Sequence, residues 1–283
     1  MFFDQSLLTD LIDRAQTHSR GSTWWEMTNQ RLGTELDIIF RGDQVELVVG
    51  DVGQLKIRNA SFGSIEAKHL FGLDELIIFA WYNLNKNRYR KTLDLGANIG
   101  IHSLVMSKLG FEVTAYEPDP IHIEIFKSQL QDNSVKNITL RTRAIANNSG
   151  KMNFTRVIGN TTGSHLTGSK QNPYGDLEHF EVDVDAFRDV VNEGYDFIKM
   201  DVEGFEAKLL GSLDPGQLEN TEIMLEVGTY EHALEVWKDI ERLGLIAYSQ
   251  KNNWHQVTSL SEVPFSYKDG SLFLTSTEGM AWN

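Results

Sequence analysis

Apolar residues recur at two different spacings along the chain, and the spacing separates predicted helices from predicted strands. Residues 6–18 place Leu7, Leu8 and Leu11 at helical spacing, with Ser6 as a capping residue. The two adjacent tryptophans at 24 and 25 follow in a segment without clear periodicity. The sequence therefore predicts an N-terminal helix and then a looser stretch.

Residues 34–60 change to the alternation of apolar and polar positions that is typical of strands. Gly42-Asp43 and Gly50-Asp51 supply turn residues between three short alternating runs, which are residues 35–40, 45–49 and 54–57. We therefore expect residues 1–70 to form an N-terminal extension with a helix and a small β meander. The extension either shapes the substrate site or serves as a structural lid or dimer surface.

Residues 71–283 alternate strands with helices, beginning with an apolar helix at 73–86. The predicted elements that follow are a strand at 92–95, a helix at 99–109, a strand at 111–117, a helix at 120–132, strands at 138–145, 151–157 and 180–184, a helix at 185–192, strands at 195–201 and 222–227, and a helix at 231–243. Residues 246–248 and 271–275 are expected to close the sheet as antiparallel strands. This alternation predicts an α/β domain with a mainly parallel sheet and helices on both faces.

The segment 158–177 interrupts this rhythm, because it is rich in turn-forming residues and long for a connection. It is either a mobile connection or a lid that faces the substrate. Within it, Asn172-Pro173-Tyr174 is similar to the Asn-Pro-Pro-Tyr loop of base amino-methyltransferases. It lacks the second proline and precedes the next core strand, so we discount that similarity.

The clearest binding signal is the turn after the strand at 92–95. Gly96 and Gly100 flank a turn that leads into a helix, so the backbone can approach a ligand closely and the first helical N–H groups point at it. Glu117 ends the next strand, 21 residues past Gly96. That is the place of a ribose-binding carboxylate in a nucleotide-binding β-α-β unit.

A nicotinamide dinucleotide fits this turn poorly. Its fingerprint requires G-x-G-x-x-G, but Asn98 stands where the second glycine should be. Asp94, just before the turn, would repel a pyrophosphate, whereas it can help to bind a cationic amino group through a hydrogen-bond network. S-adenosylmethionine carries a sulfonium, an amino group and a carboxylate in place of the pyrophosphate, so we interpret the turn as a methyl-donor site.

The composition limits which partners and which kinds of site are expected. The formal net charge of −14 repels nucleic acid and anionic membranes, so neither is expected as the main partner. No stretch is long and apolar enough for a membrane span, and the first four residues do not resemble a signal peptide, which favours a cytoplasmic protein. The chain has no cysteine, so disulfides and thiolate metal sites are excluded.

A second group of acidic residues follows the strand at 195–201. Asp201, Glu203 and Glu206 stand at its carboxyl end, and Glu226 lies near the end of the next strand, where ligands bind in open α/β sheets. Asp201 or Glu203 could be the general base that deprotonates an acceptor hydroxyl. Alternatively the acids could hold Mg²⁺, or Glu203 and Glu206 could simply favour a helix N-terminus.

Two histidines are further candidates. His165, in the long segment, could be a catalytic base because imidazole titrates near neutrality; a solvent-exposed loop histidine is the alternative. His102, on the helix after the glycine turn, is interpreted as structural or as a neighbour of the cofactor rather than as catalytic.

Three motifs together resemble the FkbM family of S-adenosylmethionine-dependent methyltransferases. They are LDLGANIG at residues 93–100, YEPD at 116–119 and IKMDVEGFE at 198–206. The last is similar to the family's D-V-E-G-x-E, with Phe205 where a smaller residue is common. The segments 160–164 and 182–187 resemble the small-residue loop and the lead-in before that motif. The resemblance covers about residues 70–230.

This resemblance implies a class I, seven-stranded methyltransferase fold and O-methylation of a hydroxyl on a sugar, a glycan or a polyketide-like metabolite. Glu117 would take the ribose hydroxyls, and Asp201 and Glu203 would face the acceptor. The expected cofactor residues are Asp94, Gly96, Ala97, Asn98, Gly100, His102, Glu117, Pro118, Asp119, Ala144 and Asp201, and the expected catalytic residues are Asp201, Glu203 and His165.

The sequence therefore predicts an S-adenosylmethionine-dependent enzyme that acts on a small-molecule or glycan hydroxyl. Two alternatives stay open: a non-catalytic nucleotide-binding protein and, with less support, a nicotinamide-dependent oxidoreductase. A Mg²⁺ requirement and the oligomeric state are not assigned.

Overall fold

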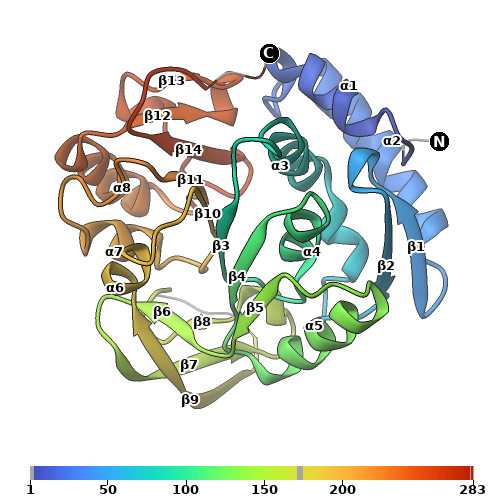
Figure 1. The fold of residues 1–283 in the computed structure, drawn as a ribbon, viewed down its shortest axis with the longest axis horizontal. Helices are drawn as coiled ribbons and strands as arrows, with labels where there is room; N and C mark the ends of the chain where they lie inside the picture. The colour runs from blue at the N-terminus through green and yellow to red at the C-terminus, as the bar shows by residue number, and fades with distance from the viewer. Residues whose placement is uncertain (1–2, 171–174, 281, 283) are drawn as a thin grey trace.

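The structure is a computed structural model that describes residues 3–170, 175–280 and 282 (Figure 1). The Asn172-Pro173-Tyr174 segment lies outside the described residues. Eight strands form the main sheet: β3 (Lys91–Leu95), β4 (Glu112–Tyr116), β5 (Ile138–Arg141), β10 (Phe197–Met200), β11 (Glu222–Glu226), β12 (Ile246–Ser249), β13 (His255–Gln256) and β14 (Ser271–Thr275). Their spatial order is β13-β12-β14-β11-β10-β3-β4-β5.

The main sheet is doubly wound. The strands from β5 through β3 to β11 are parallel, and β14 inserts antiparallel between β11 and β12. The chain leaves β3 toward β4 and β5 on one side and later returns to β10 on the other, so the strand order reverses between β3 and β10. The predicted α/β class with a mostly parallel sheet is confirmed, and the two-residue β13 adds an eighth strand at the edge.

Helices cover both faces of this sheet. On one face lie α3 (Leu73–Leu84), α4 (Ile101–Lys108) and α5 (Pro120–Asp132), and on the other lie α6 (Phe187–Val191), α7 (Glu206–Gly211) and α8 (Tyr230–Leu243) (Figure 1). Two separate apolar clusters correspond to these faces, one built on α3 and α4 and the other on α7 and α8. A sheet buried on both faces explains why its strands read as short apolar runs.

A second, four-stranded sheet was not predicted. It contains β6 (Ala144–Ala146), β7 (Gly150–Val157), β8 (His165–Leu166) and β9 (Leu177–Ala186), in the order β6-β9-β7-β8. The single strand expected over 138–145 is wrong, because β5 belongs to the main sheet and β6 to this one. Strand periodicity shows that a segment is extended but does not identify its partner, so the pattern could not separate the two sheets.

The N-terminal region contains α1 (Leu7–Asp13), α2 (Thr23–Ile39) and a two-stranded hairpin of β1 (Gln44–Val48) and β2 (Gln54–Arg58). The expected strand at 35–40 and the looser stretch at the tryptophans are wrong, because residues 35–39 and both tryptophans belong to α2. Ser22 caps this helix by accepting the N–H of Trp25, and Leu32 and Leu36 are its buried residues. Leu32 and Leu36 are four apart, the helical spacing that a short alternating run can conceal.

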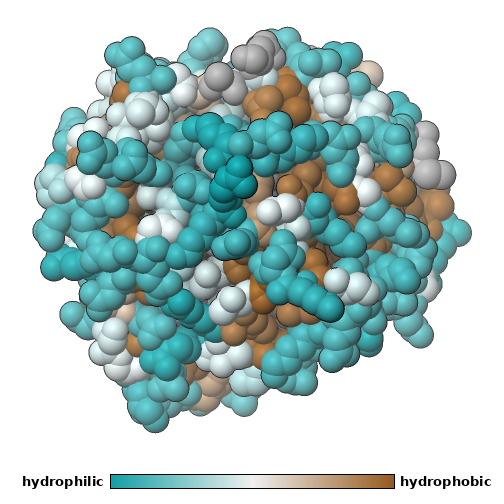
Figure 2. Space-filling model, viewed as in Figure 1, coloured by the Kyte–Doolittle hydropathy of each residue, from teal (hydrophilic) through white to brown (hydrophobic). Residues whose placement is uncertain are grey.

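This region packs on the same apolar cluster as α3 and α4. Figure 1 shows α1, α2 and the β1–β2 hairpin beside these helices, and Figure 2 shows brown hydrophobic residues between the hydrophilic ones on this face. No helix in the part of the chain that the structure describes is long and apolar enough to cross a membrane. The division of the chain at residue 70 stays a prediction.

A buried histidine joins the N-terminal region to the C-terminal part of the chain. The Nε1–H of Trp254 donates to Nδ1 of His18 at 2.9 Å, and Nε2–H of His18 donates to the carbonyl of Leu11 at 3.0 Å. Both ring nitrogens are thus used by the neutral ring. Burial lowers the pKa of His18 to about 4.

We expect this histidine to make stability fall as the solution becomes acidic. A neutral His18 in the folded state and a protonated one in the unfolded state should lower the free energy of unfolding by roughly 3 kcal/mol as pH falls from about 6.5 to 4. Urea unfolding at pH 7.5, 5.5 and 4.0 should show a clearly larger loss in the wild type than in His18→Gln. The exposed His255 serves as control, and His255→Gln should keep the wild-type slope. Identical slopes in all three proteins would contradict this assignment.

Candidate active site

A cavity opens beside the carboxyl ends of β3 and β10, where the strand order of the main sheet reverses. It holds about 620 Å³ of empty space including its open mouth, which is within the usual range for a small-molecule site. The main sheet contributes residues from the ends of β3, β4 and β10, and the second sheet contributes residues from β6, β7 and β8. This crevice is where an open α/β sheet binds its ligand.

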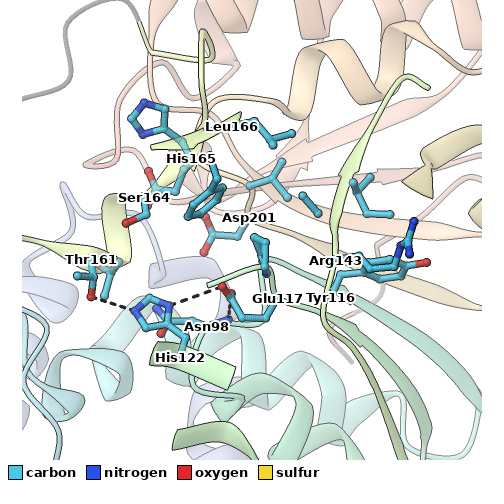
Figure 3. A pocket seen from close by; sticks show the side chains of 18 residues that line it. Asn98, Tyr116, Glu117, His122, Arg143, Thr161, Ser164, His165, Leu166 and Asp201 are labelled. Carbon is cyan, nitrogen blue, oxygen red and sulfur yellow. Dashed lines mark hydrogen bonds and ion pairs between the residues drawn. The ribbon is translucent and has the colours of Figure 1, made fainter. Parts of the chain in front are cut away.

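The predicted residues in the cavity wall come from five segments of the chain. In Figure 3, Asn98, Glu117 and His122 lie on one side, Ser164 and His165 on the opposite side, and Asp201 between them. The members of the predicted sets that line the cavity are Gly96, Asn98, Glu117, Pro118, Ala144, His165, Asp201 and Glu203.

Gly96 determines how closely β3 and β10 approach each other at this point. Its φ is +76°, and a Cβ built on it would lie 1.8 Å from the carbonyl oxygen of Asp201. The N–H of Asp201 in turn donates to the carbonyl of Leu95 at 3.0 Å. Only glycine allows both the left-handed backbone and the contact, so this residue fixes the floor of the cavity.

The N–H groups of residues 96–100, in the glycine turn, are all used within the protein. Gly96 and Ala97 both donate to the carbonyl of Tyr116, and Asn98 donates to Oε2 of Glu117 at 2.8 Å. The next two N–H groups, those of Ile99 and Gly100, bond to Asn98 Oδ1 and the Ala97 carbonyl. All five donors are used within the protein, so residues 96–100 offer no N–H cradle for a pyrophosphate.

Glu117 is held firmly at the end of β4. It is almost fully buried, and its two oxygens accept the N–H groups of Asn98 and Asp119, each at 2.8 Å. Each oxygen retains a second lone pair, so the carboxylate can still accept hydrogen bonds from hydroxyl groups. Asn98 has a φ of +53°, a left-handed conformation that asparagine tolerates better than most residues.

Several cavity residues were not predicted, and one of them joins the N-terminal region to the site. His122 lies 3.7 Å from Oε1 of Glu117 and is hydrogen-bonded through Nε2 to Thr161 Oγ1 at 2.9 Å (Figure 3). Phe62 packs edge-on against the ring of His122, and its carbonyl accepts the N–H of Thr161. No local sequence signal marks these contacts, because they join segments far apart in the chain.

Asp201 is paired with a buried lysine from the same strand. Nζ of Lys199 lies 3.0 Å from Oδ2 of Asp201. Burial alone would lower the pKa of Lys199, but the carboxylates of Asp201, Asp94 and Glu75 raise it above its ordinary value. Lys199 therefore stays charged and pairs with the Asp201 carboxylate in the cavity wall.

Glu203 connects the cavity to the segment that follows β8 and to the C-terminal loop. Oε2 of Glu203 accepts Nζ of Lys170 at 2.5 Å and the hydroxyl of Tyr267 at 3.3 Å. Burial and the nearby Asp201 carboxylate raise the pKa of Glu203, against the effect of Lys170. The carboxylate thus lines the cavity, remains partly exposed and is more basic than an ordinary glutamate.

The other two acids of the predicted cluster do not share this arrangement. Glu206 is buried and accepts the N–H groups of Val202 and Gly204, so it stabilises the backbone that carries Glu203, and burial raises its pKa to about 8. Burial also raises the pKa of Glu226 well above its ordinary value. Among the described residues, no group of three or more histidines and acids is arranged to hold a metal ion.

His165 has one free ring nitrogen. Its Nδ1–H donates to the carbonyl of Gly163 at 3.0 Å, while Nε2 is buried without a hydrogen-bond partner among the described residues. Burial lowers the pKa of this side chain, so the ring is neutral and carries its lone pair on Nε2. The expected alternative of an exposed loop histidine is wrong, because His165 is 2% exposed.

Five predicted residues lie close to the cavity but do not line it. Asp94 is fully buried and accepts the hydroxyl of Ser103 at 2.6 Å, and His102 bonds to Tyr82 and Glu75 on the far side of α4. Asp119 caps α5 and pairs with Arg156. Ala97 and Gly100 pack against Phe126 of α5. These residues therefore stabilise the glycine turn and its surroundings but do not line the cavity.

Comparison with known protein families gives one match. The family model described as "Methyltransferase FkbM domain" matches residues 94–244, which include the glycine turn, Glu117 and the Asp201–Glu206 segment. No curated protein matches this chain.

Solved structures with a similar arrangement are distant in sequence. An S-adenosylmethionine-dependent methyltransferase from Agrobacterium tumefaciens is 14% identical, with 82% of this chain and 69% of that chain covered and a TM-score of 0.45. A precorrin-6y C5,15-methyltransferase from Geobacter metallireducens is 13% identical over 68% and 82%, with a TM-score of 0.37. An rRNA methylase from Streptococcus thermophilus is 11% identical over 71% and 95%, with a TM-score of 0.38.

We expect Gly96→Ala to destabilise the fold strongly, because the new Cβ would collide with the backbone of Asp201. The free energy of unfolding should fall by more than about 3 kcal/mol, measured by urea denaturation. Gly110→Ala is the matched control, because Gly110 also has a positive φ but has nothing within 4 Å of its Cβ position. It should cost only about 1–2 kcal/mol. Equal losses in the two variants would show that the collision with Asp201 is relieved.

Proposed function

Because the chain belongs to the FkbM methyltransferase family, we propose that it transfers a methyl group from S-adenosylmethionine to a hydroxyl oxygen of a small molecule or glycan. The observation that carries this proposal is a cavity whose polar wall accepts hydrogen bonds at the switch point of the sheet. Glu117, Asp201 and Glu203 present carboxylates there, while the turn N–H groups are all used internally. The formal net charge of −14 supports a free acceptor rather than a nucleic acid or a membrane.

The cavity fits this methyl donor in its chemistry. Glu117 would accept the ribose hydroxyls, Pro118 and Ala144 offer apolar walls to the adenine, and the Asp201 carboxylate would face the positively charged methionine end. A dinucleotide would instead need N–H donors for its pyrophosphate, and residues 96–100 have none to spare. When bound, S-adenosylmethionine supplies an electrophilic methyl group on a positively charged sulfur.

Of the three candidate bases, Glu203 fits the task best. Asp201 is paired with the charged Lys199, and burial makes His165 a weaker base. Glu203 combines a raised pKa with a partly exposed carboxylate in the cavity wall. It would take the proton of the acceptor hydroxyl while the hydroxyl oxygen bonds to the methyl carbon and the bond between that carbon and the donor sulfur breaks, which would release S-adenosylhomocysteine.

We expect Glu117→Gln to weaken donor binding, because the neutral amide cannot accept two backbone N–H groups and the ribose hydroxyls together. Calorimetric titration with S-adenosylhomocysteine should show a Kd at least about tenfold higher than in the wild type. Glu112→Gln, an exposed acid at the other end of the same strand, should bind as the wild type does. Unchanged binding in Glu117→Gln, or binding of NAD to the wild type, would mean that the site is misassigned.

We expect Glu203→Gln to lower kcat by roughly 10²–10⁴-fold, measured by release of S-adenosylhomocysteine on a panel of hydroxylated acceptors. Its Kd for S-adenosylhomocysteine should stay near that of the wild type. In the wild type kcat should fall as pH drops through a pKa above the ordinary glutamate value, because the base must be ionised. His165→Asn and Asp201→Asn are measured alongside. A larger loss of kcat in His165→Asn than in Glu203→Gln would assign the base to His165 instead.

A further inference from the structure

Three exposed aromatic side chains gather beside the Glu203 end of the cavity. Tyr230, Phe265 and Tyr267 are 55%, 42% and 48% exposed. Every aromatic side chain that is exposed to this degree in the described part of the chain belongs to this group, which we call the aromatic platform. Large exposed aromatic surface on a folded protein commonly marks a place of contact with a ligand.

One ring of the aromatic platform, that of Tyr267, contacts a residue of the proposed active site. The hydroxyl of Tyr267 donates to Oε2 of Glu203 at 3.3 Å. Gly228 makes this approach possible, because a Cβ at that position would lie 2.5 Å from the ring of Tyr267. Tyr230 begins α8 shortly after β11, at the same edge of the sheet, and its ring contacts Phe265 at 6.4 Å between centroids.

The loop that carries two of these rings is held in place. The N–H of Phe265 donates to Oδ2 of Asp269 at 3.0 Å, and the N–H of Asp269 donates to the carbonyl of Ser266 at 2.9 Å. Nζ of Lys251 lies 3.8 Å from the ring centre of Phe265 and donates to the carbonyl of Ser261. The backbone of this loop is therefore held, so little backbone entropy would be lost there when a ligand covers the rings of Phe265 and Tyr267.

The charges around the aromatic platform favour a neutral ligand. Lys251 lies over Phe265, and Lys170 lies 5.9 Å from the ring centre of Tyr267, so cations already occupy positions that a cationic ligand would need. An anion would meet the carboxylate of Glu203 and the other acids of the cavity. A hydroxyl group suits the junction well, since Glu203 can accept from it and Lys170 can donate to it.

The shape favours a puckered ring over a flat one. The planes of Tyr230 and Phe265 make an angle of 73°, so they form a corner and not the parallel-walled slot that a flat aromatic acceptor would fill. A sugar ring has an apolar face of C–H groups that packs on aromatic carbons, and its hydroxyls point outward to polar partners.

We propose that the aromatic platform binds a neutral sugar ring of the methyl acceptor and places one of its hydroxyls at Glu203. This inference rests on the proposed O-methyltransferase function and narrows its acceptor to glycosides and glycans.

The test uses saturation-transfer difference NMR on the full chain with saturating S-adenosylhomocysteine. The probes are methyl glycosides of glucose, galactose, mannose, rhamnose and fucose, with catechol as a flat aromatic comparison. At least one glycoside should receive saturation at its C–H protons in the wild type. Phe265→Ala and Tyr230→Ala should each weaken its Kd by about tenfold or more, as expected for the loss of one ring contact.

Ile38→Ala is the matched control, because Ile38 is an exposed apolar side chain on α2 and belongs to neither the aromatic platform nor the cavity. This variant should bind the glycoside as the wild type does. All variants should bind S-adenosylhomocysteine equally, which separates a lost acceptor site from a lost fold. The inference is overturned if no glycoside binds, if catechol binds in preference, or if the two aromatic variants bind glycosides like the wild type.

The failure of this inference is distinguishable from the failure of the proposed function. Loss of S-adenosylhomocysteine binding in the wild type would remove the methyl-donor site and both proposals with it. Normal donor binding together with transfer to acceptors other than sugars would retain the proposed O-methylation and overturn the sugar assignment alone.

Discussion

The contact between Gly96 and the backbone of Asp201 is the constraint on which the site depends. It brings the carboxyl ends of β3 and β10 together where the strand order reverses, and no side chain fits between them. The same turn uses five consecutive N–H groups within the protein, so the glycine turn itself offers the cavity no free backbone donor. This close backbone approach therefore fixes the position of the pocket.

Long-range contacts complete the pocket around this turn. A Cβ on Gly63 would lie 2.1 Å from the carbonyl oxygen of Gly159, and the N–H of Ser64 donates to that carbonyl at 2.9 Å. On the other side of the cavity, Lys170 pairs with Glu203, and the hydroxyl of Ser169 donates to the carbonyl of Glu203. The N-terminal region and the motif after β10 therefore both anchor residues 159–170, several of which line the cavity.

The acids of the site have different tasks because their surroundings differ. Lys199 pairs with Asp201, backbone N–H groups bond to Glu206, and Glu203 has a partly exposed carboxylate with a raised pKa in the cavity wall. Four acids that look alike in the sequence thus differ in their surroundings: Asp201 is paired with a lysine, Glu206 anchors the loop, Glu203 is the proposed base, and burial raises the pKa of Glu226. Environment, not residue type, makes the distinction.

The sequence by itself determined the α/β class, the order of the core elements and the glycine turn, because periodicity and turn chemistry are local properties of the chain. It also placed Gly96, Glu117, Asp201 and Glu203 at strand ends, which the topology of an open sheet brings to one edge. Only the tertiary structure decided that residues 35–39 are helical, that β6 to β9 form a sheet of their own, that His122 lines the cavity and that Tyr267 contacts Glu203. These features depend on contacts between distant segments, and a local pattern does not specify its partner.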